Sequence, residues 1–347
     1  MGGTPTTRRD FLAEIVAYGA AITAAQQASS MSALAQARPD WKSQIGIQLY
    51  TVRDVLPADF EGVLAKVAAI GFKEVEAVSY NNMEPKPFRA MLDRCGLKMP
   101  STHAGPSAMD PNLEQQFERL QIMGVQYSAL SMGGGRGAAR GAVPAPAGPR
   151  AGGPPAPPGG IVRNSFTQAE AFGPNQPRVS LETAKQHAAA LNAGGKVARK
   201  FGIKMLVHNH TFEFEKLLDS DRTYYDVMLA ETDPSVVTME LDIGWAYTAG
   251  VDAVALFEKY PGRFELWHVK DVFGLKAVNP ALSPNERISS MSFVPVGAGQ
   301  IDYARVFKYT EVAGVKHFFL DHDNAASWGD SLGAAAVSYR ALTKIVP

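Results

Sequence analysis

Short apolar runs alternate with longer segments along most of the chain. The runs have the length of strands and fall at residues 44–50, 73–78, 97–103, 125–131, 203–210, 236–243, 264–270 and 317–321. Between them, apolar residues recur three and four positions apart, which is typical of helices that bury one face. We expect these helices at residues 60–70, 87–95, 113–123, 180–201, 224–231, 253–259, 303–312 and 332–345. Gly71 and Gly96 follow two of them, as glycine commonly does where a helix ends.

This order of elements predicts the fold class. Eight strand–helix alternations with short loops are typical of an α/β fold, the (β/α)8 TIM barrel, formed here as a single domain over residues 38–347. Residues 133–177 depart from the pattern, because they are rich in Gly, Ala and Pro and bury too little apolar surface to offset the entropy lost on ordering. We expect a disordered, flexible insertion after the fourth strand, and leave open whether it is a lid, a docking segment or an inert loop.

The N-terminal segment has the features of an export signal. Residues 6–12, Thr-Thr-Arg-Arg-Asp-Phe-Leu, resemble a twin-arginine motif, and an alanine-rich run follows. Ala35-Gln36-Ala37 is a small-x-small cleavage sequence, which predicts a twin-arginine signal peptide at residues 1–37. We therefore expect a periplasmic or secreted protein, with an attached N-terminal helix as the alternative. The run is too short and too interrupted to span a bilayer, so we do not expect an integral membrane protein.

Charge and cysteine content narrow the function classes. The chain has 34 Lys+Arg and 34 Asp+Glu, and this balance argues against a nucleic-acid-binding protein, which needs a basic excess. The single cysteine, Cys95, excludes an internal disulfide framework and a metal site of the Cys-x-x-Cys type.

Candidate chemistry begins at the end of the run at 203–210. His208 and His210 are two residues apart, so on a strand they would face the same side, with Asn209 on the other. Glu213 follows shortly after. Two imidazoles with a carboxylate nearby suit a divalent metal ion, and ordinary surface histidines are the alternative.

Two later runs also end in side chains that bind metals. Asp242 closes one and His268 lies near the end of the next. A parallel barrel brings such residues together at one rim, where active sites lie. Glu240 would lie on the same face as Asp242 but deeper in the barrel, where we expect it to be a polar partner within the core.

Several stretches together resemble the sugar phosphate isomerase/epimerase superfamily, the xylose isomerase-like TIM barrels. They span nearly the whole expected barrel in order, at residues 45–53, 71–76, 207–214, 241–242, 268–271, 296–302 and 319–323. The resemblance implies one divalent metal ion at the C-terminal rim of the barrel. Mn, Co, Zn and Mg all remain open.

The resemblance also implies ligands. Asp242 and His268 match the Asp and His ligand positions. Many members supply Glu from the fifth strand, where this chain offers His208 or His210. Asp321 stands where many members have a Glu ligand on the eighth strand, and its side chain is one methylene shorter.

Proton transfer next to a carbonyl is the chemistry that such a site would support. Glu213 and Asp321 are the candidate acid and base, with support of the metal as the alternative role. Lys270 would hold a substrate oxygen or a developing oxyanion, or else form a salt bridge with Asp271.

Other residues at the expected rim are candidates for substrate contacts. His103, Gln48 and Glu76 stand at the ends of early strands, and Asn209 lies between the two histidines. Trp245 follows the sixth strand, where its ring could stack on a sugar face or simply pack inside the protein.

These features favour a metal-dependent sugar or polyol isomerase or epimerase that acts on a small carbohydrate through an enediolate. A lyase or hydratase acting on 3-keto-glycosides or inososes would use the same first step and is the first alternative. The second is a carbohydrate-binding barrel without catalysis. A homo-oligomer is left open.

Overall fold

The computed structural model describes residues 40–131, 178–274, 282 and 284–347. The barrel unit comprises the described part of Trp41–Pro347. The expected signal peptide and the expected insertion at 133–177 lie outside the described residues, so both stay predictions.

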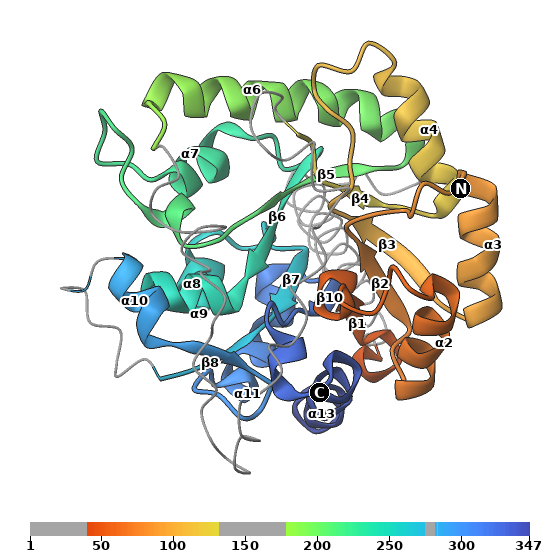
Figure 1. Cartoon of the computed structure of the whole chain (residues 1–347). Coiled ribbons are helices and arrows are strands. Elements are labelled where there is room, and N and C mark those ends of the chain that lie inside the picture. Colours follow the sequence, from red (N-terminus) through yellow and green to blue (C-terminus); the bar gives the residue numbers. More distant parts are fainter. Residues whose placement is uncertain (1–39, 132–177, 275–281, 283) are drawn as a thin grey trace, which may run out of the picture. The chain divides into compact units, whose positions relative to one another are not determined.

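Eight parallel strands close into a barrel, as the alternation of apolar runs predicts (Figure 1). Around the barrel they follow the order β1-β10-β7-β6-β5-β4-β3-β2. Their bounds are β1 Gly46–Gln48, β2 Glu74–Ala77, β3 Lys98–Thr102, β4 Tyr127–Ser128, β5 Lys204–His208, β6 Val237–Asp242, β7 Leu266–Val269 and β10 His317–Leu320. Strands and helices thus form the predicted TIM barrel.

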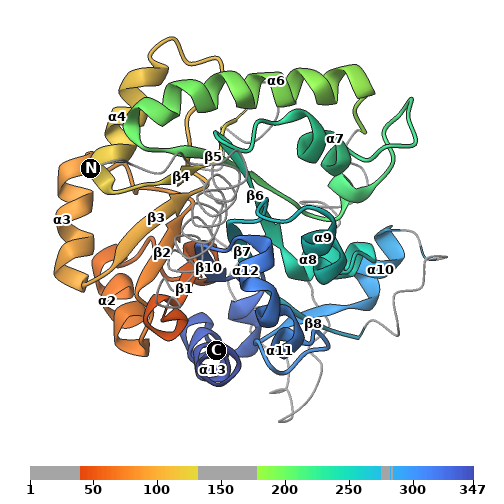
Figure 2. The same ribbon diagram turned by 180° about the vertical axis from the view of Figure 1, so that it is seen from behind.

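Helices surround the strands, as the views from both ends of the barrel show (Figures 1 and 2). They are α2 Phe60–Ile70, α3 Pro85–Cys95, α4 Leu113–Met123, α6 Leu181–Ala198, α7 Tyr224–Glu231, α9 Ala253–Lys259, α11 Tyr303–Val306, α12 Thr310–Ala313 and α13 Ser331–Ile345. Local sequence fixes their ends. The Asp59 carboxylate accepts a hydrogen bond from the Gly62 amide at the start of α2, and Gly96 ends α3 in the left-handed conformation.

The apolar pattern did not predict several short elements beyond the C-terminal ends of the strands. These are α8 Ile243–Ala249, the hairpin of β8 Asp271–Phe273 and β9 Ser292–Val294, α10 Pro284–Ser290, and the 3₁₀ turns Leu49–Val52, Phe212–Phe214 and Ala325–Trp328. β1 is shorter than expected because the Gln48 side chain accepts a hydrogen bond from the Tyr50 amide and starts a turn. β5 ends at His208, so His210 lies beyond the strand.

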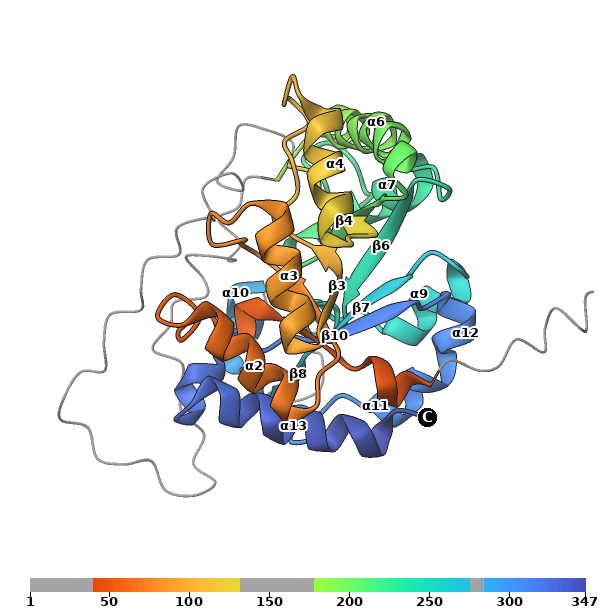
Figure 3. The same cartoon turned by 90° about the vertical axis from the view of Figure 1, so that its right-hand side faces the viewer.

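Every second residue of a barrel strand faces inward, and this period builds layers inside the barrel. The middle layer is apolar and consists of Tyr127, Leu206, Leu266 and Phe319. Charged and polar side chains lie on both sides of it: His317, the first residue of β10, and Asp321, the residue after β10, flank Phe319 at steps of two. The side view shows the strands that carry these layers (Figure 3).

Candidate metal centre

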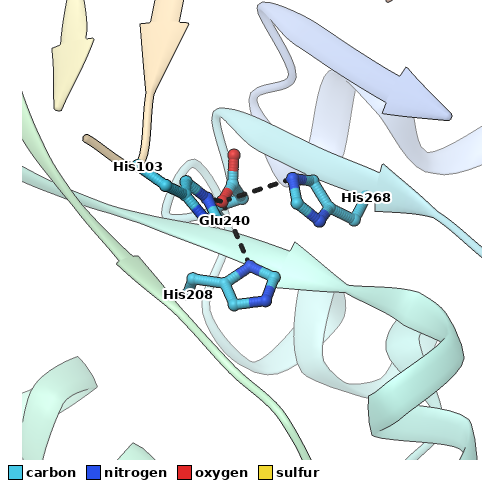
Figure 4. Close-up of side chains that lie close together, drawn as sticks. All are labelled: His103, His208, Glu240 and His268. Atoms are coloured by element: carbon cyan, nitrogen blue, oxygen red, sulfur yellow. Dashed lines mark hydrogen bonds and ion pairs between the residues drawn. The ribbon is translucent and has the colours of Figure 1, made fainter. Parts of the chain in front are cut away.

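Four side chains, each at, near or just after the C-terminal end of a different strand, converge at one end of the barrel (Figure 4). His103 follows β3, whereas His208, Glu240 and His268 belong to β5, β6 and β7. The parallel register sets His208 beside Glu240. We call His103, His208, Glu240 and His268 the imidazole cluster.

The Glu240 carboxylate is the centre of the imidazole cluster. Its Oε2 lies 2.5 Å from Nε2 of His103, 3.1 Å from Nδ1 of His208 and 3.5 Å from Nε2 of His268. The other oxygen, Oε1, is buried and has no hydrogen-bond partner among the described residues. Three ring nitrogens therefore surround one oxygen of this carboxylate (Figure 4).

The imidazole cluster fits a divalent metal ion. One ligand atom from each of its four side chains lies within 4.8 Å of all the others. Zn-type ions are bound by nitrogen and carboxylate oxygen at about 2.0–2.2 Å, so side-chain adjustments that separate His103 from Glu240 and bring the other ligand atoms closer would be needed to surround an ion. The orphaned Oε1 of Glu240 agrees with this fit, because a buried carboxylate oxygen without a partner is costly.

Burial and neighbouring charges shift the pKa values of the side chains in the imidazole cluster. Burial and the negative charge of Glu76 raise the pKa of Glu240. Burial and the neighbouring imidazoles lower the pKa of His208 well below its usual value. Burial also lowers the pKa of His103 and of His268, but the carboxylates of Glu76 and Glu240 outweigh it and raise both. Perturbed groups of this kind gather at functional sites.

Glu76 contacts the imidazole cluster and is itself held by hydrogen bonds. Its carboxylate accepts hydrogen bonds from Nε2 of Gln48 at 2.6 Å and from the Ser101 hydroxyl, and it lies 2.6 Å from Nε2 of His268. The register makes Gln48, Glu76 and Ser101 neighbours on three adjacent strands. These neighbours hold Glu76 in place beside His103 and His268, the two histidines that also contact Glu240.

A second group lies beside the first and is centred on Lys270. The Lys270 ammonium lies 2.9 Å from Asp242, 2.9 Å from Asp321 and 2.8 Å from Asp323. Its side chain is 1% exposed. We call these four residues the lysine cage. Burial opposes the charge of Lys270, but the three carboxylates raise its pKa well above the usual value.

The chain is similar to known proteins in part of its sequence and in its fold. No family model matches the chain. An inosose dehydratase from Clostridium perfringens is 29% identical over 146 residues, which cover 39% of this chain and 46% of that protein. One from Salmonella typhimurium is 30% identical over 122 residues, or 34% and 39% of the two chains. The match spans less than half the length of either relative.

Solved structures match over more of the chain. A sugar phosphate isomerase/epimerase from Parabacteroides distasonis superposes with a TM-score of 0.62 at 20% identity, covering 90% of this chain and 96% of that one. The IOLI protein, solved with a zinc atom, gives 0.57 at 11% identity over 87% and 98%. A protein from Mycobacterium smegmatis, solved with magnesium and described as a xylose isomerase-like TIM barrel, gives 0.54 at 14% identity over 88% and 96%. The chain has the xylose isomerase-like barrel fold.

Within this xylose isomerase-like barrel, the predicted ligands separate into two groups. His208 and His268 lie in the imidazole cluster, whereas Asp242 and Asp321 lie in the lysine cage with Lys270. His268 borders both, since Asp242, His268 and Asp321 also bring ligand atoms within 4.8 Å of one another. Asp242 is in addition the N-cap of α8, with its Oδ1 accepting the Trp245 amide.

His210 and Glu213 stand beside the cluster rather than in it. The His210 ring lies 5.0 Å from that of His208, and its amide donates to the Glu213 carboxylate at 2.7 Å. Oε1 of Glu213 lies 3.8 Å from Nδ1 of His210. Neither residue belongs to a group of potential metal ligands among the described residues, so the expected ligand role of His210 stays a prediction that the geometry does not favour.

Three expected substrate contacts are buried and already engaged. Asn209 is 0% exposed and bridges β5 to β6 through hydrogen bonds with the Asp242 backbone. Trp245 is also 0% exposed, with its ring against Phe293. Gln48 is 2% exposed and holds Glu76. Their contact with substrate stays a prediction that this burial disfavours, as it does for the buried Glu76.

The alternative of a salt bridge between Lys270 and Asp271 is wrong. The Asp271 carboxylate instead accepts hydrogen bonds from the amides of Gly297, Gly299 and Ile301. Lys270 is the centre of the lysine cage, so Lys270 and Asp271 bind different parts of the structure.

Two residues of these groups, Glu240 and Asp323, were not predicted as site residues from the sequence. Glu240 was expected to be a core polar partner, yet it is the centre of the imidazole cluster. Its spacing of two from Asp242 was the signal, because both residues face the barrel interior. Asp323 carried no periodic signal, since it lies in a loop beyond β10 whose path brings it back to Lys270.

No helix in the described part of the chain is long and apolar enough to cross a membrane.

Proposed function

We propose that the chain is a metal-dependent enzyme of sugars or polyols, an isomerase or epimerase that moves a proton next to a carbonyl. The imidazole cluster carries this proposal, because it gathers potential ligands from four strands at the end of the barrel where such folds place active sites. The side chains of His103 and His208 are 19% and 14% exposed, whereas Lys270 is closed off at 1%. The substrate would therefore approach past His103 and His208.

The metal would be held by His103, His208, Glu240 and His268. Three nitrogens and one carboxylate favour Zn, Co or Mn over Mg, which prefers oxygen ligands. A divalent ion bound there would polarise the substrate carbonyl and stabilise the negative charge that develops beside it.

Glu213 is the proposed proton-transfer residue. Glu213 is 7% exposed and its carboxylate accepts a hydrogen bond from the amide of His210, whose ring lies 5.0 Å from that of His208. It would take the proton from the carbon beside the carbonyl and return it to the neighbouring carbon or to the other face. Asp321 is less suited to this role, because Lys270 and His268 already engage its Oδ2.

A dehydratase acting on inososes is the second candidate. It is supported by the similarity to inosose dehydratases from two genera. The first step would be the same proton abstraction, after which the hydroxyl on the next carbon takes up a proton and leaves as water. The two candidates therefore differ in the product rather than in the first step.

Metal content and proton exchange test the proposal together. The purified protein, stripped with a chelator and reconstituted, would be measured by elemental analysis beside Glu240→Gln. Ketohexoses, 3-keto-glycosides and inososes would then be incubated with the wild-type protein in deuterated water and followed by NMR. We expect one ion per chain, lost in Glu240→Gln, and deuterium next to the carbonyl of one substrate class. An isomeric sugar indicates an isomerase or epimerase, and loss of water indicates a dehydratase.

The proposal fails if the reconstituted wild-type protein holds no ion. Binding of sugars without exchange, in a protein that does hold the ion, would leave a carbohydrate-binding barrel.

We also propose that the protein is exported by the twin-arginine route, on the basis of the Arg8-Arg9 pair and the sequence that follows it. Cell fractionation of the full chain beside an Arg8→Lys, Arg9→Lys variant tests this. Export of both forms alike, or of neither, would contradict the proposal.

A further inference from the structure

His103 is the member of the imidazole cluster that the barrel sheet holds least. The other three members lie within strands, whereas His103 follows Thr102, the last residue of β3. Its side chain is also the most exposed of the four, at 19% against 14% or less for the others. The His103 amide still donates to the Ala77 carbonyl of β2 at 2.8 Å. The sheet therefore holds the chain up to His103 and leaves the turn after it to other contacts.

The Tyr80 hydroxyl binds the residues on both sides of His103. It lies 2.7 Å from Oγ1 of Thr102 and donates to the Ala104 carbonyl at 3.0 Å. Oγ1 of Thr102 in turn accepts from the Ala104 amide at 3.0 Å, a local bond that threonine side chains commonly make in turns. Tyr80 belongs to the loop between β2 and α3, so its hydroxyl ties that loop to the turn that carries His103.

Both of these bonds can form at once. Each hydroxyl has one proton, and either oxygen can donate in the bond between Tyr80 and Thr102. The Ala104 carbonyl can only accept, so Tyr80 satisfies both neighbours when its proton goes to that carbonyl and Thr102 donates to Tyr80. Burial raises the pKa of Tyr80, so the phenol keeps the proton that it donates.

The turn at residues 104–106 lacks close packing toward the helices. A cavity of about 170 Å³ separates it from α3 and α4. Toward β4 the backbone is tight, because a Cβ on Gly105 would clash with the carbonyl of Ala129. Tyr80 borders the cavity, and its ring packs edge-to-face on Phe88 of α3, with centroids 5.5 Å apart. On the helix side, the hydrogen bonds of Tyr80 therefore hold this turn in place of direct packing.

The contacts of the His103 ring depend on where this backbone lies. Its Nε2 is 2.5 Å from Glu240 and 3.3 Å from Glu76. The ring also stacks on that of His268, with centroids 5.3 Å apart and an angle of 14° between the planes. A shift of the backbone at His103 would change all three contacts together.

We propose that Tyr80 is a positioning residue that sets the orientation of the His103 imidazole through Thr102 and Ala104. Its hydroxyl bonds to these two residues rather than to a member of the imidazole cluster. The inference rests on the proposed function, because the orientation of His103 matters for turnover only if the site is catalytic. It holds equally for a His103 ring that binds the metal and for one that touches the substrate.

NMR of the histidine side chains tests the orientation directly. The chain has seven histidines, and loss of a signal in His103→Ala identifies the His103 ring in protein labelled at the imidazole carbons. Tyr80→Phe keeps the ring that packs on Phe88 and removes the hydroxyl. We expect the His103 signals of this variant to shift or broaden, with and without Zn²⁺, because the ring leaves its stacked position on His268.

Tyr127→Phe is the matched control. It removes a phenol hydroxyl that donates to Glu265 inside the barrel, away from the turn after His103. A general loss of stability would affect both variants, whereas displacement of the His103 ring is expected in Tyr80→Phe alone.

Turnover tests the consequence. With the substrate class that shows deuterium exchange, Tyr80→Phe should lower kcat/KM by about 10–100-fold, as loss of the partner of a functional residue typically does. In a His103→Ala background the same substitution should cause little further loss, because residues that act through one another are not additive. A further loss of the same size in that background would show that Tyr80 acts by another route and would overturn the inference.

The outcomes separate the inference from the function on which it rests. A wild-type protein that exchanges no proton with any substrate class overturns the proposed function, and the NMR comparison still decides the orientation. Unchanged His103 signals in a folded Tyr80→Phe variant overturn the inference alone. Should Tyr80→Phe not fold, Thr102→Val takes its place, since it removes the hydroxyl that binds both Tyr80 and the Ala104 amide. Unchanged His103 signals in that variant likewise overturn the inference.

Discussion

The two ends of the barrel interior carry similar residue types in different states of pairing. At the N-terminal end, Glu265 lies 2.5 Å from the Lys204 ammonium and accepts a hydrogen bond from the Tyr127 hydroxyl, and Glu74 lies 2.7 Å from Nδ1 of His317. We call these five residues the basal cluster. Both of its carboxylates have partners, whereas at the C-terminal end Oε1 of Glu240 and Oδ1 of Asp321 have no hydrogen-bond partner among the described residues.

This contrast teaches what each end of the barrel is suited to do. A carboxylate with a matched partner stabilises the fold, whereas spare ligand atoms at a rim are available for a metal or a substrate. Both ends arise from the same alternation of inward-facing residues along the strands. Substitutions of the same kind at the two ends should therefore have different consequences.

The largest difference is expected for the glutamates. Glu240→Gln removes the charged oxygen at the centre of the imidazole cluster, so metal affinity should fall by more than the roughly 100-fold upper range for a supporting residue. Glu265→Gln, its matched control in the basal cluster, should lower stability and leave metal affinity unchanged. Calorimetric titration with Co²⁺ measures both. Equal loss of affinity in the two variants would contradict the contrast.

A smaller loss of metal affinity is expected at Asp321. Asp321→Asn removes the negative charge 3.1 Å from Nδ1 of His268, and the loss of such support typically costs about 10–100-fold in metal affinity. The same titration detects the change, and the number of bound ions should remain one. Complete loss of binding would make Asp321 a ligand rather than a support.

At the basal cluster the expected effect is on stability alone. Tyr127→Phe removes the hydroxyl that donates to Glu265, which should lower the free energy of unfolding by about 1–2 kcal/mol. Urea unfolding followed by circular dichroism measures this, with cobalt content as the control. A variant that loses cobalt but keeps its stability would show that the two ends are not separate.

The smallest effect is expected outside the barrel. Arg305 and Asp252 form an ion pair whose side chains are 49% and 48% exposed. Arg305→Met should change the free energy of unfolding by less than about 1 kcal/mol, because water screens such pairs. A change as large as that of Tyr127→Phe would mean that exposure does not distinguish the two pairs.

Much of this arrangement follows from local sequence, and some of it does not. The apolar periods predicted all eight barrel strands, and strand ends pointed to His208 and His268. Whether Glu240 or Asp242 lies at the centre of the imidazole cluster depends on how β5 and β7 pair with β6. The apolar period within one strand does not encode this pairing. The burial of Trp245 depended on Phe293, which comes from a hairpin that the apolar pattern did not predict.

Residues 268–271 serve three parts of the structure from one short segment: His268 belongs to the imidazole cluster, Lys270 lies among the carboxylates of the cage, and Asp271 binds the amides of Gly297 and Gly299. Their duties depend on consecutive positions, so adding or deleting one residue would turn each side chain to the wrong surface. Single side chains in this segment can therefore be substituted one at a time. An insertion or deletion, in contrast, would disturb all three groups of contacts at once.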